Sequence, residues 1–157
     1  MTSDAPTPRL ATVDDADVIA QLLHDFNAEF DIASPEPAVL APRLRTLLAG
    51  DLTYAVVAGA PSVAVALVTL RPNVWYEGQV ALLDELYVVP HLRSRGIGAA
   101  VLDLVMSTAR ARGVGLVEIN VDAPDVDAQR FYERHGFSGT DPATGDRAYY
   151  YLQELAT

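Results

Sequence analysis

A chain of 157 residues, of which 50% are hydrophobic and 20% charged, is long enough for one folded domain with a buried core. Its net charge of −10 disfavours nucleic acid and anionic membranes as partners, and the absence of cysteine excludes disulfides, thiolate catalysis and thiolate metal sites. No basic leader precedes an apolar run, and no apolar stretch approaches the roughly 20 residues that span a bilayer, so we expect a cytoplasmic protein.

The N-terminal part of the chain predicts a short strand and a helix. Residues 1–8 form a polar segment that we expect to be a flexible tail, and residues 9–157 are expected to form a single domain. RLATV is strand-like, and Thr12 and Asp15 then have the spacing of a capping box, with Asp in place of the usual Glu or Gln. The apolar residues that follow recur at helical spacing: Val18, Ile19, Leu22, Leu23, Phe26 and Phe30.

The next segments predict a second helix and then a run of strands. Pro35 and Pro37 end the first helix and open the second, whose buried face carries Leu40, Leu44, Leu47 and Leu48. Residues 52–59 and 61–72 are strand-like and meet like a hairpin. The aromatic connector NVWYEG separates them from a third strand, QVALLDELYVV.

The C-terminal half alternates between helices and strands. We expect a helix over 96–112, a strand over 114–121, a short helix over 125–136 and a last strand over 147–155. The resulting order, β-α-α-β-β-β-α-β-α-β, predicts a mixed α/β protein.

The junction LRSRGIG, residues 92–98, combines positive charge with exposed backbone where a strand gives way to a helix. The start of a helix leaves N–H groups without intrahelical partners and carries roughly half a positive charge. Gly96 and Gly98 let an anion approach that backbone, and Arg93 and Arg95 add charged donors. The junction therefore predicts a phosphate site, unless the glycines serve only the geometry of a tight turn.

Two known phosphate motifs fit the junction less well. A P-loop needs a lysine followed by Ser or Thr after the last glycine, and no lysine follows Gly98. The dinucleotide fingerprint needs a glycine where Val101 stands, although Glu118 lies about 20 residues further on, as a ribose-binding acid does. A dinucleotide-binding α/β domain stays an alternative.

A third motif fits. Arg93-x-x-Gly96-x-Gly98 resembles the (Q/R)-x-x-G-x-(G/A) motif of the GNAT superfamily of acyl-CoA N-acyltransferases, and DVDAQRFYERHGF, residues 125–137, is similar to the family's late helix. The RLAT opening before a helix is also typical. This resemblance implies an α/β GNAT fold. Its mixed central sheet has six to seven strands with a splayed parallel pair, flanked by about four helices.

The resemblance also implies how acetyl-CoA, the co-substrate, is bound. The main chain of Leu86, Tyr87 and Val88 would pair with the pantetheine arm. The pyrophosphate would meet Arg93 and the backbone N–H groups of Ser94, Arg95, Gly96, Ile97, Gly98 and Ala99. We expect no metal, because the three histidines lack metal-ligand spacing.

The catalytic residues follow from the same resemblance. Tyr132 matches the family's tyrosine, whose phenol can protonate the departing thiolate because its unperturbed pKa is near 10. Glu85, with Asp84 close behind, is the candidate for the base that binds and deprotonates an amine. Adjacent strand residues face opposite sides, so only one of the two acids points into the cleft unless a β-bulge intervenes.

One residue departs from the family pattern. Asp125 stands where the late helix often begins with asparagine, and a carboxylate only accepts hydrogen bonds. We expect Asp125 to cap the helix and keep it as a candidate cofactor contact.

The resemblance implies an N-acetyltransferase that works by direct attack in a ternary complex, and the net charge of −10 with the candidate acids predicts a small cationic amine as its acceptor. A non-catalytic acyl-CoA sensor or subunit is the main alternative. The terminal run AYYYLQEL would be an exposed edge, so we expect a homodimer, with neither nucleic acid nor membrane as a partner.

Overall fold

The structure, a computed structural model, describes residues 5–156 and divides into two compact units, Met1–Ile119 and Asn120–Thr157. Residues 1–4 of the expected tail lie outside the described residues. The sheet of the first unit contains, in spatial order, β1 (Pro8–Leu10), β2 (Thr53–Ala58), β3 (Ala64–Arg71), β4 (Val80–Val88) and β5 (Leu116–Ile119). Its helices are α1 (Ala16–Glu29), α2 (Pro37–Ala49) and α3 (Ile97–Ala111), with short 3-10 helices at Val13–Asp15 and Pro90–Leu92. The second unit contains α4 (Val126–Arg134).

The sheet is mixed. Strands β1 to β4 pair antiparallel, and β4 pairs parallel with β5. The parallel pairing runs from Val80 opposite Leu116 to Leu83 opposite Ile119, and β4 then continues to Val88 paired with β3 but not with β5. The predicted α/β class with a parallel pair that separates is confirmed.

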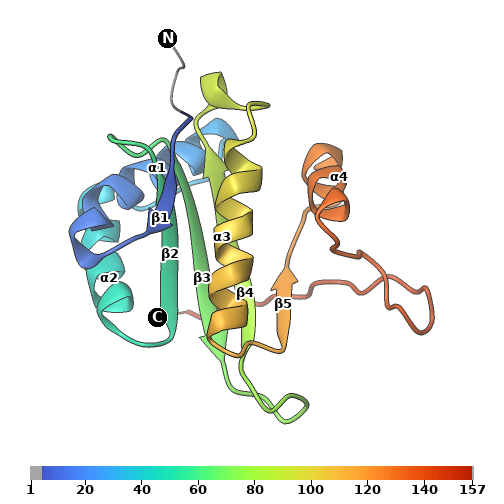
Figure 1. Ribbon diagram of the computed structural model, residues 1–157. Coiled ribbons are helices and arrows are strands. Elements are labelled where there is room, and N and C mark those ends of the chain that lie inside the picture. The colour runs from blue at the N-terminus through green and yellow to red at the C-terminus, as the bar shows by residue number, and fades with distance from the viewer. Residues whose placement is uncertain (1–4, 157) are drawn as a thin grey trace. The chain divides into compact units, whose positions relative to one another are not determined.

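Helices cover both faces of this sheet (Figure 1). One face, here called the α1–α2 face, packs on α1 and α2 through a buried cluster that includes Ile19, Leu44, Val57 and Val65. The other face packs on α3, where the Tyr54 hydroxyl donates a buried hydrogen bond of 2.9 Å to the Val105 carbonyl. Burial of apolar side chains on the two faces is the main stabilising contribution in this unit.

The short 3-10 helix Val13–Asp15, which leads into α1, confirms the predicted capping box. The Thr12 side chain and the Asp15 carboxylate each accept a backbone N–H, as the spacing predicted. The structure adds a partner that the spacing did not reveal, because Arg9 donates two hydrogen bonds to Asp15, at 2.8 and 2.7 Å. The hydrogen bonds from Arg9, more than any other cause, lower the pKa of the Asp15 carboxyl.

We expect Arg9→Met to lower the free energy of unfolding at neutral pH by roughly 1 kcal/mol, a modest value because half of the Arg9 side chain is exposed. The pKa of Asp15 is lowered in the folded state, so its stabilisation is complete above its ordinary pKa. The difference between wild type and variant should therefore shrink as the pH falls below about 4. Urea unfolding followed by circular dichroism at pH 7 and pH 3 measures this difference. Arg43→Met, at an exposed position on α2, is the matched control, and an equal loss in both variants would contradict the assignment.

The connection between β3 and β4 is an ordered loop. The Asn73 side chain accepts hydrogen bonds from the backbone N–H groups of Trp75 and Tyr76, both at 2.8 Å, and donates one of 3.0 Å to the Gly78 carbonyl. A Cβ at Gly78 would lie 1.8 Å from the Gly113 carbonyl oxygen, so only glycine fits there. The loop holds Trp75 at the surface with 86% of its area exposed.

The predicted strand over 147–155 is wrong. Within the described residues of the second unit, the only pairing near this segment is an isolated bridge between Thr140 and Arg147, and the sheet has five strands rather than six or seven. Tyr149, Tyr150 and Tyr151 are between 68% and 89% exposed. Aromatic residues favour strands, but a strand forms only where a neighbouring chain segment completes its hydrogen bonds. Among residues 5–156, no helix has the length and apolar character needed to cross a bilayer.

Candidate active site

The parallel pair opens toward the C-terminal end of β4. No residue of β5 pairs with β4 beyond Leu83, whereas β3 stays paired with β4 as far as Val88. The main chain of Leu86 and Tyr87 therefore has no β5 partner on that side. Such backbone can accept a ligand that pairs as an added strand, which is where the sequence analysis placed the pantetheine arm.

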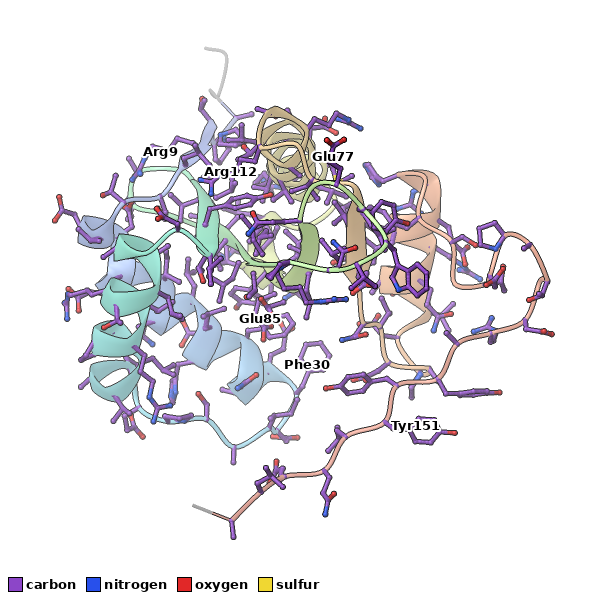
Figure 2. The ribbon with its side chains drawn as sticks, turned by 90° about the horizontal axis from the view of Figure 1, so that it is seen from below. Arg9, Phe30, Glu77, Glu85, Arg112 and Tyr151 are labelled. Carbon is purple, nitrogen blue, oxygen red and sulfur yellow. The ribbon has the colours of Figure 1, made fainter. Side chains whose placement is uncertain are left out.

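A β-bulge lies in β4 where β5 stops pairing. The β3 neighbours Leu67 and Val68 pair with Glu85 and Leu83, so Asp84 is an extra residue without a direct partner. Paired residues of a sheet point to the same face, so Glu85 shares the face of Leu67, which packs on the α1–α2 cluster. Figure 2 shows Glu85 on this side of the sheet, away from α3.

The bulge brings Asp84 to the same face. Thr69 lies two residues after Leu67 on β3, so the two side chains share a face. The Thr69 hydroxyl donates a short hydrogen bond to the Asp84 carboxylate, which places Asp84 on this face as well. Without the bulge, Asp84 and Glu85 would point to opposite faces. The arrangement that the sequence analysis made conditional on a bulge is present.

The surroundings raise the pKa of both acids. Burial raises the pKa of the Glu85 carboxyl, and the negative charge of Asp84 raises it further. Burial also raises the pKa of Asp84, but the hydrogen bond from Thr69 opposes this effect. Asp84 exposes more of its surface than Glu85, so we consider burial to act more strongly on Glu85. Glu85 is therefore the better proton acceptor near neutral pH.

Within the described part of the first unit, the two acids have no cationic partner. On the same face, Arg71 of β3 forms an ion pair with Glu118 of β5, with 3.1 Å between the guanidinium nitrogen and the carboxylate oxygen. Within residues 5–119, no ion pair joins Asp84 or Glu85 to a basic side chain. The pair therefore concentrates negative charge on one face, where it attracts cations.

An aromatic group adjoins the acid pair. Tyr87 lies two residues after Glu85 on β4 and shares its face, and its ring meets Phe26 of α1 edge-on, with centroids 5.1 Å apart. The ring centroid of Phe30 lies 5.5 Å from that of Phe26, and half of the Phe30 surface is exposed. A carboxylate pair beside an aromatic surface suits an organic cation.

The loop after β4 fits a phosphate group. Ser94 and Gly96 both have left-handed backbone, with φ of 61° and 82°, which turns the chain into α3. No side chain caps the first turn of α3, and Arg95 beside it is exposed. The leading N–H groups of the helix can therefore bind an anion, as the sequence predicted for this loop.

Arg93 has structural partners. Its Nε donates to the Val88 carbonyl at 2.9 Å, and one terminal nitrogen donates to the Glu29 carboxylate at 2.8 Å. Its guanidinium also lies 5.6 Å from the centre of the Tyr87 ring. Arg93 thereby ties the loop to the ends of β4 and α1. Its contact with a phosphate stays a prediction.

The second unit contains the other two predicted site residues. Asp125 is the N-cap of α4, as predicted, because its carboxylate accepts the Ala128 N–H at 3.0 Å. The Tyr132 ring packs edge-on against Phe131 and Phe137, at 5.2 and 5.7 Å between centroids. The roles of Asp125 and Tyr132 toward a cofactor stay predictions.

Comparison with known proteins identifies the family. The family model described as the acetyltransferase (GNAT) family matches residues 19–137. The chain belongs to this family. The match includes β4, the following loop, α3 and α4, and therefore both quoted motifs, but not the RLAT opening at residues 9–12.

Solved structures share the whole fold. The crystal structure of an inferred acetyltransferase from Arthrobacter sp. FB24 is 46% identical, covers 99% of both chains and superposes with a TM-score of 0.90. An aminoglycoside acetyltransferase from an uncultured soil metagenomic sample, in complex with sisomicin, is 18% identical over 96% of this chain and 97% of that chain, with a TM-score of 0.78. At this identity the second likeness shows the fold alone.

Curated relatives match only in part. A mycothiol acetyltransferase of Beutenbergia cavernae is 35% identical over 72 residues, which make up 44% of this chain and 24% of that protein. An uncharacterized N-acetyltransferase of Methanocaldococcus jannaschii is 36% identical over 67 residues, 43% of this chain and 30% of that protein. The matched stretch therefore spans less than a third of either relative's length.

Two further residues contact the site and have no signal in the sequence. Thr69 bonds to Asp84, 15 positions along the chain, and Glu29 bonds to Arg93, 64 positions away. Neither residue belongs to a motif. Only the strand register and the helix packing bring them to their partners.

Proposed function

We propose that the protein transfers the acetyl group of acetyl-CoA to a small cationic primary amine by direct attack in a ternary complex. The observation that carries this proposal is the bulge in β4. It supports a site in which Asp84 and Glu85 share one face, at the position where β5 stops pairing and the open main chain begins. Acyl transfer is the chemistry of the family. The acid pair adds a group that can hold the ammonium form of an amine and a group that can take its proton.

The proposed roles follow from proton balance. A primary amine with a lysine-like pKa near 10.4 is almost entirely protonated at neutral pH. Asp84 attracts the ammonium group, and Glu85 takes its proton. The amine nitrogen then attacks the thioester carbonyl carbon, and the carbon–sulfur bond breaks as the amide forms. The sulfur leaves with the electron pair and receives a proton from Tyr132, the proposed acid.

The proposed cofactor contacts lie along the end of β4 and the start of α3. The main chain of Leu86, Tyr87 and Val88 pairs with the pantetheine arm, and the first turn of α3 faces the pyrophosphate with Arg95 beside it. The absence of a side-chain cap on this helix supports the phosphate contact.

The experiment that tests the function measures release of the CoA thiol with a panel of amines. The panel contains polyamines, amino sugars and amino acids. It also contains an amine that carries a carboxylate where a diamine carries its second ammonium group. We expect the highest kcat/KM for cationic acceptors, with KM rising as salt screens the acid pair. An anionic best substrate whose KM is indifferent to salt contradicts the acceptor class. Binding of acetyl-CoA without turnover of any amine would favour the sensor alternative.

Gly98→Val tests the cofactor site. Acetyl-CoA is expected to raise the melting temperature of the wild type, because a ligand bound only by the folded state stabilises that state. In the variant we expect this shift to fall by at least half, since the valine side chain at the start of α3 keeps a phosphate away from the backbone. Differential scanning fluorimetry with acetyl-CoA, and with NAD for comparison, measures both shifts.

The control for this variant is Ser107→Val, which introduces the same side chain on an exposed position of α3, remote from its start. It should keep the acetyl-CoA shift. A normal shift in Gly98→Val contradicts the loop assignment, and equal shifts from NAD and acetyl-CoA favour the dinucleotide alternative. The homodimer and the cytoplasmic location stay predictions.

A further inference from the structure

We infer that Thr69 is a positioning residue of the acceptor site, whose hydroxyl holds Asp84 beside Glu85 so that the two carboxylates act as a pair with different tasks. The inference rests on the function proposed above. It adds a residue that lies outside both quoted motifs, residues 93–98 and 125–137.

The bulge makes such a holding contact necessary. Asp84 has no direct partner on β3, so the pairing of the strands does not fix the direction of its side chain. Thr69 lies opposite Leu82, on the neighbouring strand, and its hydroxyl reaches the Asp84 carboxylate. Threonine is stiff about its first side-chain torsion, so a strand presents this hydroxyl in a defined direction.

The contact also separates the roles of the two acids. The Thr69 hydroxyl donates to the carboxylate of Asp84 and so favours its charged form. Within residues 5–119 no side chain donates a hydrogen bond to Glu85. Burial and the negative charge of Asp84 instead favour the protonated form of Glu85. As the pH falls, Glu85 is therefore the first of the pair to take a proton. Asp84 remains charged to hold the amine.

The remaining charged groups near this face do not replace Thr69. They come from β3, β5, α1, the loop after β4 and β4 itself: Arg71, Glu118, Asp25, Glu29, Arg93 and Tyr87. The two arginines are paired with Glu118 and Glu29, and the other groups are acidic or neutral. In the described part of the first unit, Thr69 is thus the side chain that donates to the acid pair.

The test compares Thr69→Val, which has the same shape without the hydroxyl, with Thr69→Ser, which restores it. In Thr69→Val we expect KM for a diamine such as putrescine to rise about three- to tenfold, from loss of one hydrogen bond to a charged group. Below the acid limb set by Glu85, kcat/KM should fall more steeply with falling pH than in the wild type, because the pKa of Asp84 rises when the hydrogen bond is removed and Asp84 then also takes a proton in this range. Thr69→Ser is expected to recover both values.

Folding and cofactor binding serve as controls. Thr69 is exposed, and both variants should keep the melting temperature and its shift with acetyl-CoA. Thr69→Ala is a second variant without a hydroxyl, for use if the valine side chain disturbs the strand. If the wild type acetylates amines and Thr69→Val has the same KM and pH profile, the inference about Thr69 is wrong while the proposed function stands. A wild type that acetylates no amine overturns the proposed function instead.

Discussion

Glu85→Gln is expected to lower kcat for cationic amines about 100- to 10,000-fold, the range that a positioned acid or base usually contributes. Glutamine keeps the size of the side chain but has no carboxylate to take the proton of the ammonium group. The pKa of Glu85 is raised by burial and by the charge of Asp84, so the acid limb of the wild-type profile should lie above the ordinary glutamic acid pKa. Steady-state kinetics between pH 5 and pH 9, with saturating acetyl-CoA, measures both effects.

The matched control for Glu85 is Glu77→Gln. Glu77 is an exposed acid in the loop between β3 and β4, and Figure 2 shows it on the opposite side of the sheet from Glu85. Both substitutions remove one negative charge, so a general effect of net charge appears in both. If Glu85→Gln kept the wild-type kcat, Glu85 would not be the base, and Asp84 or water would have to take the proton.

Tyr132→Phe is expected to lower turnover about 10- to 1,000-fold with little change in acetyl-CoA affinity, because the phenol is proposed to protonate the departing sulfur. The substitution removes one oxygen and keeps the ring that packs against Phe131 and Phe137. Single-turnover kinetics separates the chemical step from product release, and thermal shift measures acetyl-CoA binding.

Tyr149→Phe provides the control for Tyr132. Tyr149 is 78% exposed and lies outside the family's tyrosine motif, so loss of its hydroxyl should leave turnover unchanged. Equal turnover in Tyr132→Phe and the wild type would contradict the proposed role of Tyr132 as the acid.

Local signals in the sequence predicted most of the fold. The spacing of Thr12 and Asp15 indicated the short helix that leads into α1, and Gly96, whose φ of 82° suits glycine, indicated the start of α3. Asp125 likewise predicted the N-cap of α4. Each of these features depends on residues within a few positions of each other, so a single sequence is sufficient to find them.

Features that depend on register or on distant partners were harder to predict. A bulge adds one residue to a strand without altering its apolar pattern, so the sequence allowed a bulge at Asp84 but could not place it. The contacts made by Thr69 and Glu29 join separate elements and have no local signature. The prediction of a strand over 147–155 was wrong because strand propensity does not show whether a neighbouring segment is present to complete the backbone hydrogen bonds.

The ordered loop that presents Trp75 also determines which spectroscopic signal can be used. Trp75 is the sole tryptophan of the sequence, and 86% of its surface meets solvent in the folded protein. Its indole emission is therefore expected to resemble that of the unfolded chain and to be quenched readily by iodide. Tryptophan fluorescence will report on the β3–β4 loop rather than on global unfolding, whereas circular dichroism follows the helices that pack on the sheet.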